Sequence, residues 1–200
     1  MARPDQVVLR REEILTHAAA LFQERGFGAA TMRHLAERVG MEASSLYNHF
    51  ASKQAILAAI CTQIANAYLT PMAAIEATDD GYQLKIESLL RLHIRLAQQC
   101  GPAVTVAGSE YKHLAPAALE TYLHSRRDYE QRFEELIIKG IRANEFRPHS
   151  PRLLMLTLLA AVRWVEHPPR HSPATTGQQL EETIINLLMH GLADRLMHTT

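Results

Sequence analysis

The sequence contains little cysteine, few aromatic residues and no excess of either charge. Its two cysteines, Cys61 and Cys100, are far apart in the chain, which argues against a disulfide scaffold and gives no metal-binding spacing. Aromatic residues make up 6% of the chain, and 21 basic residues balance 21 acidic ones. Because the formal net charge is zero, average electrostatics give no general attraction to nucleic acid, and function must be inferred from the pattern of residues.

Long apolar runs and catalytic signatures are also absent. The N-terminal residues lack the apolar core of a signal peptide, and the longest apolar stretch, 153–165, is too short to span a bilayer. No G-x-S-x-G, P-loop, H-E-x-x-H or dinucleotide-binding motif occurs. We therefore expect a cytoplasmic protein with no membrane partner, enzymatic activity, metal or other cofactor. An enzyme is a distant alternative, which turnover by the purified protein would support.

Apolar residues recur at helical spacing throughout, and no stretch alternates as a β-strand does. The sequence therefore predicts an all-α fold of about nine helices. Beyond the first 50 residues, helices are expected over 52–69, 84–99, 116–143, 151–166 and 180–196, with a short segment to 113 after a break at Gly101-Pro102. Three prolines within 167–177 indicate a loop.

Four local signals divide the N-terminal part. Gly26 is expected to end the first helix in a left-handed conformation, and Gly40 to form a tight turn after the second. Thr31 and Ser52 are expected to cap the helices that follow them. Short helices joined by a glycine-containing turn are typical of a helix-turn-helix.

Residues 10–60 carry the most specific pattern in the chain. They contain IL..AA.LF.E.GF..AT...LA...G, followed by SSLYNHFASKQAIL. This pattern resembles the DNA-binding region of the TetR family of transcriptional regulators. The resemblance implies an N-terminal three-helix helix-turn-helix DNA-binding domain over 1–55 and a larger helical ligand-binding and dimerisation domain over 56–200. The residues alone would also fit a three-helix packing module that does not bind DNA.

The resemblance assigns DNA reading to a helix over 43–50, placed in the major groove of double-stranded operator DNA. Small hydroxyl and amide side chains on its outer face can reach base edges, while aromatic and basic groups suit phosphates. The residues expected to contact DNA are Arg10, Arg11, Thr31, Arg33, Ser44, Ser45, Tyr47, Asn48, His49 and Lys53. Glu42, where many family members carry serine, is expected to cap this helix rather than touch DNA.

The last two expected helices are the most apolar part of the body. Residues 153–165 are apolar nearly all round, and a second stripe runs from Leu180 through Leu188 to Leu196. In the TetR family the corresponding pair forms a four-helix bundle with a second subunit, which matches the two-fold symmetry of operators. We therefore expect a homodimer. Burial of both helices in a monomer core is the alternative.

The stretch 126–164, RRDYEQRFEELIIKGIRANEFRPHSPRLLMLTLLAAVRW, resembles more loosely a subset of the family that responds to CoA thioesters. The resemblance implies a small-molecule effector, an acyl-CoA or related metabolite, whose anionic head an arginine would hold. The residues expected to bind it are Tyr111, Tyr122, Arg126, Arg127, Phe133 and Trp164. Only one of the adjacent arginines need face inward, and we favour Arg127. The alternatives are salt bridges to Glu130 for the arginines and plain packing for Trp164.

The expected function is thus that of a ligand-responsive transcriptional regulator, a repressor that its effector releases from the operator. The helix over 52–69 would link the DNA-binding domain to the body. A DNA-binding regulator without an effector is the second hypothesis, and ligand-induced loss of DNA binding distinguishes the two. The eleven histidines have no zinc-like spacing, so we expect no metal site.

Overall fold

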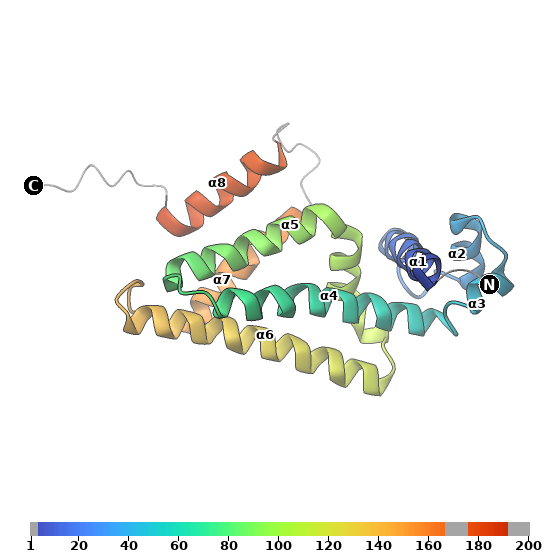
Figure 1. The fold of residues 1–200 in the computed structure, drawn as a ribbon, viewed down its shortest axis with the longest axis horizontal. Coiled ribbons are helices and arrows are strands. Elements are labelled where there is room, and N and C mark those ends of the chain that lie inside the picture. Colours follow the sequence, from blue (N-terminus) through green and yellow to red (C-terminus); the bar gives the residue numbers. More distant parts are fainter. Residues whose placement is uncertain (1–3, 167–175, 192–200) are drawn as a thin grey trace, which may run out of the picture. The chain divides into compact units, whose positions relative to one another are not determined.

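A computed structural model describes residues 4–166 and 176–191 of the chain (Figure 1). Over these residues it contains eight α-helices, two short 3-10 helices and no strand, which confirms the all-α prediction. The predicted helix count of about nine included a break at Gly101-Pro102. In the structure α5 (Tyr82–Ser109) continues through both residues, with a non-helical Cys100 (φ −138°, ψ 39°) at the kink.

The first three helices are α1 (Pro4–Arg25), α2 (Met32–Val39) and α3 (Ala43–Tyr47). Gly26 and Gly40 take positive φ values of 76° and 70°, so both predicted left-handed turns are confirmed. The Thr31 hydroxyl accepts a hydrogen bond from the backbone N–H of His34 at 3.1 Å, which confirms the predicted cap of α2. Ser52 likewise caps the next helix by accepting from the N–H of Ala55 at 3.1 Å.

The remaining helices are α4 (Lys53–Glu76), α5, α6 (Pro116–Arg142), α7 (Pro151–Arg163) and α8 (Gly177–His190). The 3-10 helices are η1 (Tyr111–His113) and η2 (Trp164–Glu166). Helix α4 runs through Pro71 rather than ending near residue 69 as predicted. Most of the loop predicted over 167–177 lies outside the described residues, as does the predicted end of the last helix, including Leu196.

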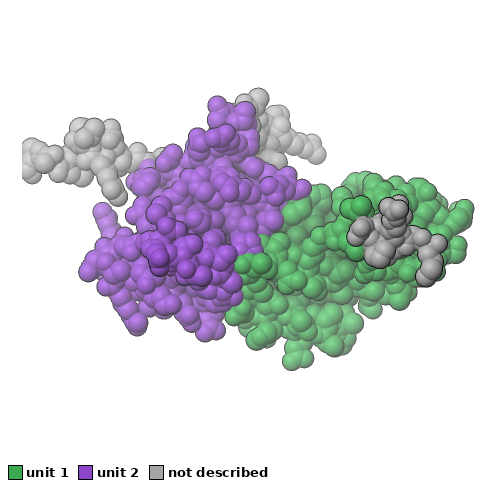
Figure 2. Space-filling view, in the orientation of Figure 1, with its two compact units in different colours: residues 1–70, 100–128 green, residues 71–99, 129–200 purple. Residues whose placement is uncertain are grey.

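The chain forms two compact units, shown in different colours in Figure 2. Unit 1 comprises residues 1–70 and 100–128, and unit 2 comprises residues 71–99 and 129–200. The three-helix domain predicted for 1–55 lies within unit 1. Helices α4, α5 and α6 each contribute residues to both units.

Helix α4 is the one described helix that is long and apolar enough to cross a membrane, with a mean hydropathy of 1.3 in its most apolar window. Length and composition alone do not separate such a span from the core helix of a soluble protein. Ile56, Leu57 and Ile60 of α4 are completely buried, as residues of a core helix are, and 33% of the most apolar window is buried.

Candidate functional site

Helix α3 presents a polar face to solvent and an apolar face to the core. Leu46 is completely buried, whereas 52% of Tyr47 is exposed. Ser44 and Asn48 are also exposed, and Ser45 is half-buried. The helix ends at Tyr47, with Asn48 as its C-cap, and is therefore shorter than the predicted 43–50. His49 consequently lies after the helix rather than on its face.

Glu42 occupies the N-cap position of α3 but makes no capping hydrogen bond with its side chain. The prediction that it caps this helix is therefore wrong. Caps are made by short side chains, whose oxygen can turn back onto the backbone N–H groups of the first turn. The longer glutamate side chain is instead exposed to solvent.

Arg11 of α1 contacts the segment that follows α3, whereas Arg10 and Arg33 pair with carboxylates on their own helices. Arg11 donates a hydrogen bond to the carbonyl of His49 and lies 4.1 Å from the centre of the Phe50 ring, so it holds the segment that follows α3. Arg10 pairs with Glu13 at 2.5 Å on α1. Arg33 pairs with Glu37 at 3.1 Å but keeps 86% of its side chain exposed, so it is accessible to a phosphate.

Lys53 is the predicted DNA contact with the most internal partners. Its Nζ donates to the carbonyls of Phe27, Gly28 and Ala30 at 2.6, 3.3 and 2.7 Å. The same Nζ lies 4.4 Å from the centre of the Phe27 ring. The three ammonium protons therefore have three carbonyl partners, all in the loop between α1 and α2.

Three of the predicted effector residues lie together in unit 1. The Arg126 guanidinium is 5.2 Å from the centre of the Tyr111 ring, and Tyr111 and Tyr122 have ring centres 5.8 Å apart. The Tyr122 hydroxyl donates to the carbonyl of Ala107 at 2.7 Å, which fixes that ring. We call Tyr111, Tyr122 and Arg126 the tyrosine cluster.

Arg126 faces Tyr111, while Arg127, the arginine favoured from the sequence, is exposed. Glu130, the alternative partner for both arginines, accepts from Arg152 at 3.0 Å. The other two predicted effector residues belong to unit 2. There Phe133 is completely buried and 41% of Trp164 is exposed.

A part-buried polar pair in unit 2 was not predicted from the sequence. His93 Nε2 lies 2.9 Å from the Tyr129 hydroxyl, and the two rings meet edge to face at 5.6 Å between centres. Burial lowers the pKa of His93 to about 3, and the positive charge of Arg163 adds to this effect. The imidazole is therefore neutral at physiological pH.

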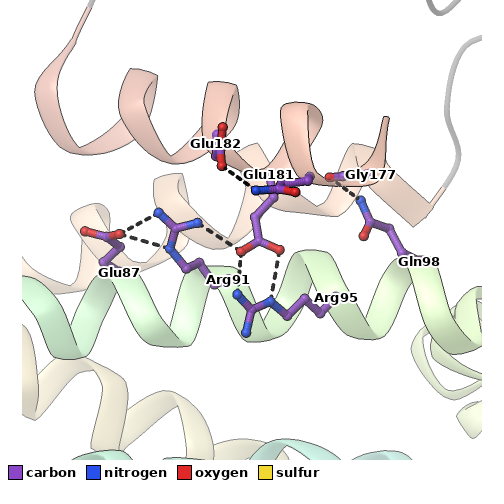
Figure 3. Close-up of polar contacts among 8 residues, drawn as sticks. Glu87, Arg91, Arg95, Gln98, Gly177, Glu181 and Glu182 are labelled. Atoms are coloured by element: carbon purple, nitrogen blue, oxygen red, sulfur yellow. Dashed lines mark hydrogen bonds and ion pairs between the residues drawn. The ribbon is translucent and has the colours of Figure 1, made fainter. Parts of the chain in front are cut away.

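A charged cluster joins α8 to α5 within unit 2 (Figure 3). The Glu181 carboxylate accepts hydrogen bonds from Arg91 at 2.9 Å and from Arg95 at 2.8 and 3.0 Å. Arg91 also donates to Glu87 at 2.7 Å. Burial opposes ionisation of Glu181, but the hydrogen bonds from Arg95 and Arg91 outweigh it and keep its pKa below the ordinary value.

The described part of the chain offers neither a metal-binding cluster nor an activated cysteine thiol. No group of three or more histidine, cysteine or acidic residues there could hold a metal ion. Burial raises the pKa of the Cys61 thiol to about 12 and also raises that of Cys100. Both thiols are therefore protonated and weakly nucleophilic at neutral pH.

Comparisons with known proteins match both parts of the chain to regulators. The family described as bacterial regulatory proteins, tetR family, matches residues 14–60, and the family of tetracyclin repressor-like C-terminal domains matches residues 79–192. The HTH-type transcriptional repressor KstR2 of Rhodococcus jostii is 27% identical over 190 residues, which cover 92% of this chain and 91% of KstR2.

Two solved structures share the fold. The ketosteroid transcriptional regulator KstR2 of Mycobacterium tuberculosis has a TM-score of 0.82 at 22% identity, with coverage of 93% of this chain and 96% of that one. AibR in complex with isovaleryl coenzyme A and operator DNA has a TM-score of 0.78 at 20% identity, with coverage of 90% and 98%. At identities this low, the structural similarity establishes a common fold. The ligand of this chain has to be inferred from its own residues.

Proposed function

This chain belongs to the TetR family of bacterial regulatory proteins, and on that premise we propose that it is a transcriptional repressor that a small effector releases from operator DNA. The observation that supports this most directly is the exposed polar face of α3. A helix presenting hydroxyl and amide groups beside a buried Leu46 is suited to reading base edges in the major groove.

We assign base reading to Ser44, Ser45 and Asn48, and phosphate contacts to Tyr47 and His49. Arg10, Thr31 and Arg33 would add phosphate contacts from α1 and from the start of α2. These contacts position the protein and supply most of the salt-dependent affinity, whereas the α3 side chains supply sequence preference.

For the effector we infer an acyl-CoA or a similar molecule with an apolar tail and an anionic head. The tyrosine cluster offers aromatic surface together with one half-buried cation, Arg126, and this combination suits such a molecule. AibR, which shares the fold, is described as bound to isovaleryl coenzyme A and operator DNA. A ligand that prefers a conformation unsuited to DNA weakens DNA binding, and DNA weakens ligand binding by the same factor.

The first experiment selects duplexes from a random DNA library with the wild-type chain and measures their affinity. Tyr47→Ala should weaken binding to the selected duplex, because a phosphate contact is lost. Failure to enrich any duplex, or full affinity in a combined Ser44→Ala, Tyr47→Ala and Asn48→Ala variant, would contradict the assignment of α3.

The second experiment titrates the protein–DNA complex with acyl-CoAs of increasing chain length and with free CoA. Release of DNA by an acyl-CoA at concentrations where free CoA has no effect would support the effector class. Arg126→Ala should lose this response, while Arg127→Ala, which removes the same charge from an exposed neighbour, should keep it. DNA binding that no acyl-CoA changes favours a regulator with another effector or none.

A further inference from the structure

The loop between α1 and α2, residues 26–31, is held from two sides by side chains that follow the helix-turn-helix in sequence. Phe27, the second residue of this loop, is 6% exposed and packs edge to face on Phe22 with ring centres 5.3 Å apart. The loop leads directly into α2, the first helix of the helix-turn-helix, so its position determines where α2 and α3 begin.

One side of the loop is held by Lys53 from the first turn of α4. Its ammonium group binds three loop carbonyls and lies over the Phe27 ring. A cation that is surrounded by carbonyls and an aromatic face gains little by turning outward to a phosphate, because it would leave all of these partners.

The other side is held by residues at the end of α5 and in η1. The Glu110 carboxylate accepts a hydrogen bond from the Phe27 N–H at 3.3 Å and lies 3.4 Å from His113 Nε2. The His113 ring stacks on the Phe27 ring with centres 5.3 Å apart and an interplanar angle of 23°. Phe27 therefore lies between an ammonium group and an imidazole, all within unit 1.

We propose that Lys53, Glu110 and His113 form a clasp on Phe27 that positions the helix-turn-helix for DNA binding without touching DNA. The inference rests on the proposed DNA-reading function and goes beyond it by assigning Lys53 an internal partner set instead of a phosphate. It also adds two residues from outside the predicted DNA-binding domain. Loss of any one contact lets the loop move and lowers the fraction of molecules in the binding-competent arrangement.

Substitution of Glu110 gives the sharpest test. An effect of its charge alone and a role in positioning the loop predict opposite changes in DNA affinity. Removing a carboxylate near DNA strengthens binding by electrostatics alone. The clasp instead predicts that Glu110→Ala weakens binding to the selected duplex by about fivefold or more, since the Phe27 N–H loses its acceptor. Glu110→Gln removes the same charge but keeps a carbonyl acceptor, and it should bind at least as tightly as wild type.

The second part of the experiment measures the DNA affinity of Lys53 and His113 variants at several salt concentrations. Lys53→Met should weaken binding while leaving the salt slope unchanged, whereas loss of a phosphate contact lowers the slope by about one. Lys112→Met, which removes one positive charge from an exposed position beside His113, is the matched control and should keep wild-type affinity. His113→Ala changes a side chain that is 42% exposed, so the fold should tolerate it while DNA binding weakens.

Circular dichroism and thermal melting confirm that each variant is folded before its affinity is compared. Tighter or unchanged binding by Glu110→Ala, or a salt slope reduced by about one in Lys53→Met, overturns the clasp while leaving the proposed function intact. If the wild-type chain selects no duplex, both the clasp and the proposed function fail.

Discussion

His93 is a half-buried residue whose protonation opposes folding. Its Nε2 faces the Tyr129 hydroxyl at 2.9 Å, and burial together with the charge of Arg163 lowers its pKa from 6.5 to about 3. Between these two pH values the unfolded chain binds a proton at His93 and the folded chain does not. The resulting contribution to stability is complete above pH 6.5 and is lost as the pH falls towards 3.

We predict that this histidine lowers the free energy of unfolding by up to about 1.4 kcal/mol for each pH unit within that window. His93→Gln retains a polar group opposite Tyr129 without titrating, so its stability should fall less steeply with pH. Denaturant unfolding at a series of pH values measures the difference, with the exposed His124→Gln as control. Equal slopes for wild type and His93→Gln would show that the proton is bound elsewhere.

Gly140 is a position where any side chain would collide with its neighbours. A Cβ there would lie 2.3 Å from two ring carbons of Phe146 and 3.0 Å from Cβ of Tyr82. We predict that Gly140→Ala destabilises the chain by about 1–3 kcal/mol, because an aromatic ring must move. Gly101→Ala has no atom within 4 Å of the added Cβ and should be neutral or stabilising in the same denaturation measurement.

Most residue-level predictions succeeded where the relevant interaction is local, although the local cap predicted for Glu42 is wrong. The turns at Gly26 and Gly40 and the cap at Thr31 follow from chemistry within a few residues, so the sequence is sufficient to predict them. The partners of Lys53 lie more than twenty residues away in the chain, as the separation of 26 residues from Phe27 illustrates. A single sequence does not show whether such a lysine binds backbone carbonyls or DNA phosphates, or which carbonyls it binds.

At the level of helices, α8 is held to α5 by the Glu181 carboxylate and by a hydrogen bond from Gln98 Nε2 to the Gly177 carbonyl at 3.1 Å. Glu181 is 7% exposed and receives hydrogen bonds from both Arg91 and Arg95 (Figure 3). Its pKa is lowered because the two arginines outweigh the opposing effect of burial. The contribution of Glu181 to stability is therefore present at neutral pH and is lost as the pH falls through its lowered pKa.

We predict that Glu181→Gln lowers the free energy of unfolding by about 1–3 kcal/mol, because two charged hydrogen bonds to a buried acceptor are weakened. Arg95→Gln should cost less, since Glu181 retains Arg91. Glu182→Gln is the matched control, because this neighbouring carboxylate is exposed and accepts a hydrogen bond from the exposed Gln178 at 3.0 Å. Equal effects of the substitutions at 181 and 182 in chemical denaturation would contradict a role for this cluster in holding α8.

Helix positions were largely predictable, and errors arose where context overrides a local signal. Proline ordinarily ends a helix, yet both Pro71 in α4 and Pro102 in α5 lie inside helices. At Pro102 the predicted break survives as the kink at Cys100. Helix α3 also ends before the predicted position 50, at Tyr47, with Asn48 as its C-cap.

At the level of the whole molecule, α7, η2 and α8 leave large apolar side chains in solvent. Leu153 is 64% exposed, Leu156 45%, Trp164 41% and Leu187 44%, all of them in unit 2. Exposed leucine and tryptophan side chains on neighbouring elements are typical of a protein–protein interface. The sequence predicted a homodimer through its last two helices, and these exposures support that prediction.

We therefore predict a dimer at micromolar concentration that buries these side chains, and sedimentation equilibrium measures it. A double variant, Leu153→Glu with Leu187→Glu, should be monomeric and folded, because both side chains already lie in solvent in the single chain. Leu84→Glu places a charge at another exposed leucine, 54% accessible on α5, and should remain dimeric. Monomers should also bind the selected duplex more weakly. A dimer contacts two half-sites about 34–36 Å apart, whereas a monomer contacts one half-site. A wild-type chain that sediments as a monomer, or a double variant that stays dimeric, would place the interface elsewhere or exclude it.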